Sequence, residues 1–161
     1  MEILKFPHPA LLNKCEPVTV FDSNLHVLVA GMYDTMKASN GMGLAANQVG
    51  IPYRIFVMIS TEGSAYCIIN PKIIEKSKNS ANLKEGCLSA PGEFLILSER
   101  ASWVVVEYQN ASGEKLRGVF KDLNAVCVQH EMGHLDGKSH LQSTSIPKQK
   151  RKELAKKWGL K

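Results

Sequence analysis

The sequence predicts an α+β fold, in which small antiparallel β-sheets pack around a central metal-binding helix, with an N-terminal helix and a C-terminal helix. Residues 23–40 have the apolar spacing of a long amphipathic helix. Residues 53–120 hold short β-branched and aromatic runs separated by turn residues, which is typical of strands. Residues 122–137 have a helical pattern and contain His-Glu-x-x-His. With 161 residues, of which 44% are hydrophobic, we expect one domain, 1–161, that ends in a basic helix, 147–161.

The N-terminal region begins irregularly and then becomes helical. Three prolines break the first 21 residues, which leaves room for one helical turn at most. Asp22 or Ser23 is the expected N-cap of the first long helix, which should end near Asn40 and Gly41. The residues that form its apolar stripe are Leu25, Leu28, Val29, Met32, Tyr33 and Met36.

The segment 41–50 is rich in small residues and nearly uncharged. Such a segment suits a place where the backbone approaches a ligand or another element closely, although it also suits a tight connection into the next strand. Gln48 is its one long polar side chain, and a buried glutamine needs hydrogen-bond partners.

The strands expected after this segment are short. We expect residues 83–92, which hold Cys87 between glycines and a proline, to be a structured turn rather than a plain strand. The turn at 110–113 predicts that the last two strands form a hairpin. The expected strands are 53–59, 65–70, 72–76 (separated from the one before by Pro71), 94–97, 103–108 and 115–120.

The His-Glu-x-x-His helix places His130 and His134 one turn apart on one face, so that both can bind one metal ion. Glu131 lies beside them and can reach a water molecule on that ion. Asp122 is the expected N-cap and Gly137 the expected stop. The apolar residues that continue the histidine stripe are Leu123, Val126 and Cys127. The alternative is a helix that carries two histidines by chance.

A catalytic metal usually has three protein ligands, so a third is required, and the sequence offers three candidates. His140 completes a match to the metzincin signature, which would make the protein a zinc endopeptidase, but no methionine follows Met132 to form a Met-turn. We therefore expect His140 to be a surface or hydrogen-bonding histidine. Glu153 would suit a gluzincin, but its lysine neighbours predict a solvent-facing position. Cys87 offers a thiolate from a glycine-rich turn, which suits zinc or ferrous iron.

Composition restricts the environment and the partners. No apolar run approaches the roughly 20 residues of a membrane span, and the N-terminus lacks the layout of a signal peptide. We therefore expect a cytoplasmic protein, or an organellar one whose transit peptide was removed. The four cysteines include no Cys-x-x-Cys pair, so we expect thiols rather than disulfides. The tail 147–161 has seven basic residues and one acidic residue, which indicates contact with a polyanion or a solvated helix face.

Three blocks of the sequence, in order, resemble the three signature motifs of peptide deformylases. They are Gly-Met-Gly-Leu-Ala-Ala-Asn-Gln at 41–48, Glu-Gly-Cys-Leu-Ser at 85–89 and Gln-His-Glu-Met-Gly-His-Leu at 129–135. The Asn-Pro pair at 70–71 and the early proline-containing segment are similar to the family as well. The resemblance covers nearly the whole chain.

The resemblance implies a ligand set and a reaction. Cys87, His130 and His134 would hold one divalent metal ion, natively Fe²⁺, with Zn²⁺, Ni²⁺ or Co²⁺ as replacements. Glu131 would act as general base and acid on a metal-activated water. The reaction would be the hydrolytic removal of the formyl group from the N-terminal formyl-methionine of newly made polypeptides.

The resemblance also implies how the substrate is bound. Gln48 and the backbone N–H of Leu88 would bind the formyl oxygen, and Arg100 would be the partner of Glu85. The implied substrate-binding residues are Met42, Gly43, Leu83, Glu85, Gly86, Leu123, Val126 and Cys127. The positions at which the chain departs from many members of the family are Asn47 instead of proline, Gly133 instead of aspartate, and Phe94 instead of a substrate-contacting arginine.

Partners follow from the same resemblance. The substrate would be an N-formylmethionyl peptide, the protein would be a monomer without a membrane partner, and the basic C-terminal helix would dock on the ribosome. A zinc endopeptidase that uses His130, His134 and His140 is the alternative enzyme. A binding module with a structural Cys–His zinc site is a third class, although such sites usually have four protein ligands.

Overall fold

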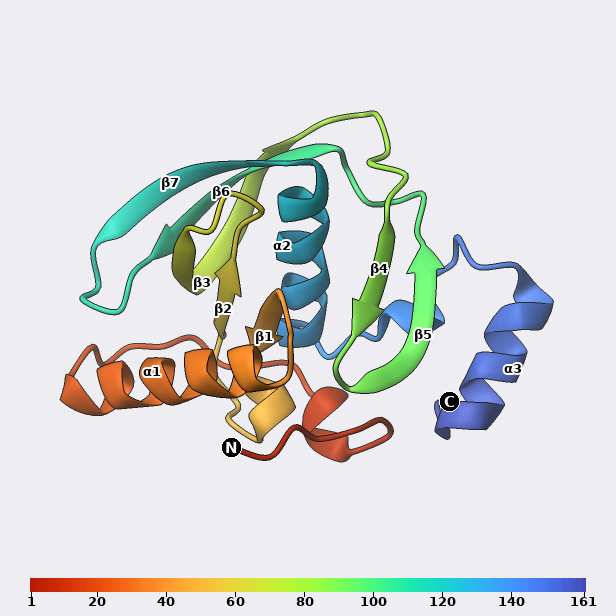
Figure 1. Cartoon of the computed structure of the whole chain (residues 1–161), viewed down its shortest axis with the longest axis horizontal. Helices are drawn as coiled ribbons and strands as arrows, with labels where there is room; N and C mark the ends of the chain where they lie inside the picture. The colour runs from red at the N-terminus through yellow and green to blue at the C-terminus, as the bar shows by residue number, and fades with distance from the viewer.

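The computed structural model describes residues 1–161, which form two antiparallel sheets on either side of one helix (Figure 1). The larger sheet has the strand order β1-β2-β3-β6-β7, and the smaller sheet pairs β4 with β5. The helices are α1 (Ser23–Ala38), α2 (Asp122–Leu135) and α3 (Lys148–Trp158). The strands are β1 (Gly43–Ala45), β2 (Ile55–Ile59), β3 (Ala65–Lys76), β4 (Lys84–Cys87), β5 (Ala90–Ile96), β6 (Trp103–Gln109) and β7 (Lys115–Lys121). Short 3₁₀ helices span Pro9–Leu11, Ala46–Val49 and His140–Gln142.

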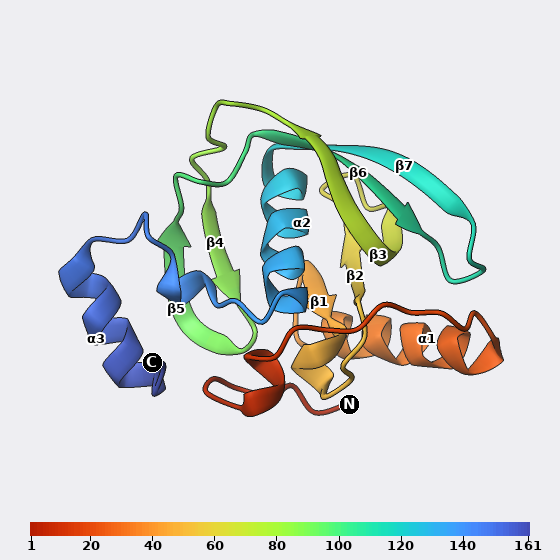
Figure 2. The ribbon, with the colours of Figure 1, turned by 180° about the vertical axis from the view of Figure 1, so that it is seen from behind.

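The α+β prediction is confirmed, because α2 stands between the two sheets in both views of the ribbon (Figures 1 and 2). Apolar burial packs α2 against the larger sheet, since Ala125 and Val128 are fully buried in one apolar cluster with Phe56 of β2 and Phe120 of β7. The helix α3 lies beyond β5, at the far side from α1. None of the helices is long and apolar enough to cross a bilayer.

The ends of the helices follow the sequence in two of three places. Asp22 caps α1 by accepting a hydrogen bond from the N–H of Leu25 at 3.0 Å, as predicted. Gly137 ends α2 with φ +68°, and a Cβ there would come within 2.7 Å of the Leu12 carbonyl oxygen, so glycine is required. The prediction for Asp122 is wrong: it is the first residue of α2, and the N-cap is Lys121, which makes no side-chain cap.

Two strand predictions are corrected. Residues 65–76 form the single strand β3 instead of two strands, because a register shift between Ile69 and Lys72 accommodates Pro71 without a ladder hydrogen bond. Residues 83–92 are not only a turn. They include β4 and the start of β5, which pair as a hairpin with an irregularity between Glu85 and Cys87. The β6–β7 hairpin is confirmed.

Candidate metal centre and catalytic cavity

The helix α2 carries three buried polar side chains at the site, and two of them, His130 and Glu131, line one cavity. His130 and His134 lie one turn apart with ring centroids 4.9 Å apart, and Glu131 lies between them in sequence. All three are less than a tenth exposed. Ionisable side chains are rarely buried this deeply without partners, so their surroundings carry the chemistry of the site.

Cys87, at the end of β4, brings a sulfur to the two histidines. Its Sγ is 3.1 Å from Nε2 of His134, and the ligand atoms of Cys87, His130 and His134 all lie within 4.8 Å of one another. The N–H of Ser89 donates to the same sulfur at 3.4 Å. The hairpin turn after Cys87 therefore holds the thiol where a third metal ligand is required.

Glu85 fixes the orientation of His130. Arg100 donates to both carboxylate oxygens of Glu85, through Nε at 2.7 Å and Nη2 at 2.6 Å, and Nδ1 of His130 lies 2.8 Å from Oε1 of Glu85. Burial acts to raise the pKa of Glu85, but the hydrogen bonds from Arg100 and His130 outweigh it and lower that pKa to about 2. Because Nδ1 of His130 faces Glu85, Nε2 is left to bind a metal, which is the usual arrangement for a metal-binding histidine.

The chemistry of these donors fits a divalent metal ion. Burial holds the pKa of His134 well below its usual range, so the ring is neutral and has a lone pair to donate. Burial also acts to lower the pKa of His130, but the neighbouring Cys87, Glu85 and Glu131 raise it to about 10. The groups around this ring therefore favour a positive charge at the site. One sulfur and two imidazole nitrogens in such surroundings suit zinc or ferrous iron.

Glu131 is placed to exchange a proton. It is 4% exposed, and burial raises the pKa of its carboxyl to about 7. Its Oε2 makes no hydrogen bond with the rest of the chain, so that oxygen is free to meet a substrate or water. A carboxyl whose pKa lies near the working pH can both accept and return a proton.

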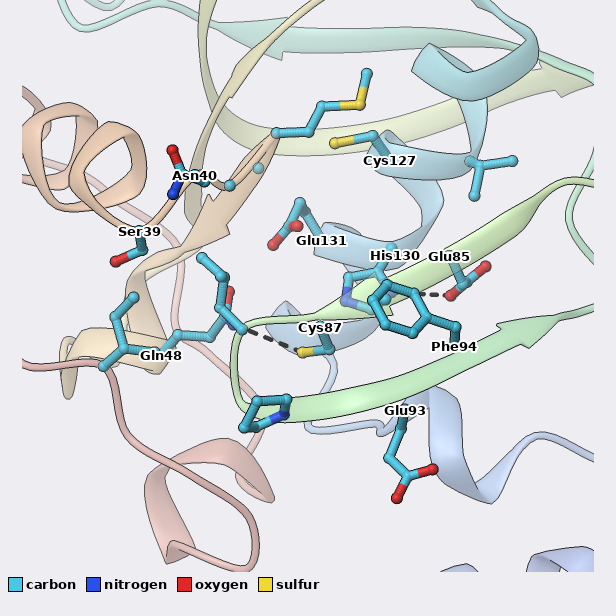
Figure 3. Close-up of a pocket in the computed structure, with 18 of the residues that line it drawn as sticks. Ser39, Asn40, Gln48, Glu85, Cys87, Glu93, Phe94, Cys127, His130 and Glu131 are labelled. Atoms are coloured by element: carbon cyan, nitrogen blue, oxygen red, sulfur yellow. Dashed lines mark hydrogen bonds and ion pairs between the residues drawn. The ribbon is translucent and has the colours of Figure 1, made fainter.

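Gln48 turns a fixed amide donor toward Cys87 (Figure 3). Its Oε1 accepts the N–H of Ala45 at 2.9 Å, which determines that Nε2 is the end facing the site. That Nε2 donates to Oγ of Ser89 at 3.0 Å and lies 3.7 Å from Sγ of Cys87. A neutral N–H donor therefore stands beside the cluster of metal-binding atoms.

These groups share a cavity of about 620 Å³. All the predicted site residues line it except His134 and Leu83, and Leu83 has 36% of its surface exposed. The prediction for Leu83 as a pocket residue is therefore not supported. Leu123 lines the cavity but is 37% exposed, so the buried stripe of α2 begins only at Val126.

Several lining residues were not predicted. Ile3 and Lys5 come from the N-terminal segment. No local pattern marks them, because they reach the cavity through tertiary packing of segments that are distant in sequence. Phe94 of β5 also lines the cavity, and only the resemblance had marked its position, as the place of a substrate-contacting arginine. The other lining residues without a prediction are Ser39, Asn40, Lys84, Pro91, Gly92 and Glu93.

The two rival third ligands lie elsewhere. His140 is outside the cluster of metal-binding atoms, and its ring centroid is 5.1 Å from that of His130. The expectation of a surface position for His140 is wrong, because the side chain is buried. Glu153 is exposed on α3, where it accepts a hydrogen bond from Gln149 at 3.1 Å.

Comparison with known proteins decides between a deformylase and a metzincin endopeptidase. The sequence profile of the Polypeptide deformylase family matches residues 1–151. The chain belongs to the peptide deformylase family. The resemblance of the three sequence blocks is thereby confirmed, and the metzincin alternative is not supported. Peptide deformylases are metal-dependent hydrolases, and the activity of this chain is the removal of the N-formyl group from nascent polypeptides.

Relatives and solved structures agree with this assignment over nearly the whole chain. A protein of Agrobacterium fabrum named peptide deformylase-like is 40% identical over 97% of this chain and 93% of its own length. The peptide deformylase of Phenylobacterium zucineum is 43% identical over 84% and 82%. The crystal structure of peptide deformylase from Ehrlichia chaffeensis, 36% identical, matches with a TM-score of 0.90 over 99% of this chain and 94% of that one. The Synechococcus elongatus enzyme in complex with actinonin matches at 0.89, with 32% identity over 99% and 86%.

Proposed function

We propose that Cys87, His130 and His134 hold the divalent metal ion of this deformylase and that Glu131 carries the proton of the reaction. The observation that supports this most strongly is the convergence of the three ligand atoms within 4.8 Å of one another, in a cavity that Glu131 and Gln48 also line. A bound divalent ion supplies the Lewis acidity that makes a water molecule nucleophilic at neutral pH.

Glu131 moves the proton in both halves of the reaction. It accepts the proton of the attacking water and later donates it to the amine of the methionine as that amine leaves. Burial supports this role, because it raises the pKa of the carboxyl to about 7, so that both protonation forms are present near neutral pH. The Oε2 atom supports it as well, since it makes no hydrogen bond with the chain.

Gln48 and Leu88 bind the oxygen of the formyl group. Attack on the formyl carbon builds negative charge on that oxygen, and neutral N–H donors stabilise it. Nε2 of Gln48 is oriented by the bond from Ala45 to Oε1, and the N–H of Leu88 donates to no other backbone group. Both residues line the same cavity.

The methionine side chain enters the apolar part of the cavity. Met42, Val126 and Cys127 line that part together with Leu123. Gly43 has no room for a side chain, since a Cβ there would come within 2.6 Å of Oε1 of Glu131. The peptide lies extended along two strands, because β1 is the edge of the larger sheet and β4 pairs only with β5.

We propose ferrous iron as the native ion, with zinc, nickel or cobalt as functional replacements, since one thiolate and two imidazoles suit these ions. The ligand set is tested by metal content per chain in Cys87→Ser and in His140→Ala. The proposal expects Cys87→Ser to lose the ion and His140→Ala to retain it. Loss of metal in His140→Ala with retention in Cys87→Ser would refute the ligand set.

The reaction is tested with purified, metal-loaded protein. We expect formate release from formyl-Met-Ala and no cleavage of casein or of an internally quenched peptide. Cleavage of internal peptide bonds without formate release would contradict the proposed function and favour an endopeptidase.

We further propose that the chain is one catalytic domain, 1–161, that acts as a cytoplasmic monomer and meets new polypeptides at the ribosome through α3. The side chains of Lys157 and Trp158 both donate to Glu93 of β5, so α3 is attached beside the cavity while its other lysines face outward. Exchange of exposed Lys148, Lys152 and Lys156 for glutamate should abolish co-sedimentation with ribosomes and leave formyl-Met-Ala hydrolysis intact. Undiminished co-sedimentation would rule out this contact.

A further inference from the structure

Phe94 of β5 is a large apolar side chain that forms part of the wall of the catalytic cavity and is nevertheless 64% exposed. A single exposed apolar residue is ordinary on a protein surface. The position of Phe94 is unusual because it belongs to the cavity that holds Cys87, His130 and Glu131. Its free surface therefore faces the space that a bound peptide would share.

The ring of Phe94 is supported by the backbone of β4. A Cβ placed on Gly86 would lie 2.7 Å from Cε1 and 2.9 Å from Cδ1 of Phe94, so the ring rests where a side chain of residue 86 would otherwise be. Gly86 directly precedes Cys87, and both line the cavity. Close contact with β4 holds the aromatic surface next to the strand along which the peptide is proposed to lie.

The polar neighbour of Phe94 does not compete for this surface. The carboxylate of Glu93 receives hydrogen bonds from Lys157 and Trp158 of α3. Figure 3 shows it turned away from the ring of Phe94 and from Cys87. Leu88 and Leu123 are apolar members of the same cavity lining. With Glu93 turned away (Figure 3), the surface that the Phe94 ring itself offers is suited to an apolar group.

An extended substrate would bring its later residues to this wall. Successive residues of a strand advance about 3.3 Å, and their side chains alternate between two faces. With the methionine side chain beside Val126 and Cys127, the next two residues run on past the metal-binding atoms, where Phe94 offers the exposed aromatic surface of the cavity.

We propose that Phe94 is a specificity-determining residue that favours formylated peptides with a large apolar or aromatic side chain at one of the two positions after the methionine. The inference rests on the proposed function, since it requires a formyl-methionyl peptide in the cavity. Contact of this kind strengthens ground-state and transition-state binding alike, so its effect falls on KM rather than on kcat.

The test compares kcat and KM for formyl-Met-X-Ala and formyl-Met-Ala-X, in which X is Phe, Leu, Ser or Asp. If a substrate side chain covers roughly 60 Å² of the ring, kcat/KM should differ by about tenfold between Phe and Ser at the contacted position. Phe94→Ala should abolish most of that difference by raising KM for the Phe peptide, and Phe94→Leu should keep part of it.

Ile96→Ala is the matched control, because Ile96 is on the same strand, is 51% exposed and does not line the cavity. We expect this variant to keep the wild-type preference. An unchanged ratio between Phe and Ser peptides in Phe94→Ala, or an equal loss for every peptide, would overturn the inference. Absence of formate release from all peptides with the wild-type protein would instead refute the proposed function, so the two failures are distinguishable.

Discussion

The buried pair of Glu85 and Arg100 allows a quantitative prediction for the variant Arg100→Met. The side chains of Glu85 and Arg100 are only 4% and 14% exposed, so the charge of Glu85 depends on partners within the chain. The pKa of Glu85 falls from 4.5 to about 2, and a shift of this size corresponds to about 3 kcal/mol of stability. Removal of one partner from a buried pair costs a similar amount, about 3–5 kcal/mol, because the other charge is left buried.

The contribution of ionised Glu85 to the stability of the folded protein also has a defined pH dependence. Because the folded-state pKa lies below the unfolded value, the stabilisation is fully present above about pH 4.5 and is lost as the pH falls toward about 2. The difference in unfolding free energy between wild type and Arg100→Met should therefore be large at pH 7 and shrink below pH 4.5. Loss of the support for His130 should also weaken metal binding by about 10–100-fold.

The assay is urea unfolding of the metal-free protein, followed by circular dichroism, together with metal competition against a chelator. Arg117→Met is the matched control, since Arg117 pairs with Glu75 at 3.5 Å with both side chains more than half exposed. Such an exposed pair contributes at most about 1 kcal/mol. The reasoning would be refuted if Arg100→Met destabilised the protein no more than Arg117→Met does.

Three further predictions follow from single residues. Gly133→Ala should raise stability by about 0.5–1 kcal/mol, because a Cβ there meets no atom within 4 Å inside α2; a lower melting temperature would contradict this. Gln48→Ala should lower kcat for formyl-Met-Ala by about 100–1,000-fold at unchanged metal content, and a loss of less than tenfold would exclude its role as a donor. Burial raises the thiol pKa of Cys15 to about 11 and of Cys67 to about 12, so both should be alkylated far more slowly at pH 8 in the folded protein than in urea, as mass spectrometry can measure.

The sequence predicted best what depends on local periodicity. The spacing of His130, Glu131 and His134 requires only a helix to form half of the metal site, and α2 is that helix. The amphipathic stripe that begins at Leu25 likewise predicted α1, and the N-cap Asp22 was correct. Such features are decided within a few turns of the chain, where side-chain identity and backbone geometry are directly linked.

The sequence could not predict from periodicity what depends on contacts between distant segments. Cys87 and Gln48 lie 43 and 82 residues before His130. Residue chemistry alone left Cys87 as one of three candidate ligands, and only the resemblance to a family chose it and assigned Gln48 to the site. Pro71 suggested a break, but a bulge in β3 absorbed it. The burial of His140 and the place of Phe94 in the cavity wall depend on the packing of β5 and the segment after α2, which no local pattern records.

The most direct test of the proposed chemistry is formate release from formyl-Met-Ala by the wild type and by Glu131→Gln at equal metal content. The substitution keeps the shape of the side chain and removes its ability to accept a proton. We predict that Glu131→Gln retains one metal ion per chain and loses about 100–10,000-fold in kcat. A metal-loaded Glu131→Gln protein that releases formate at the wild-type rate would contradict this prediction.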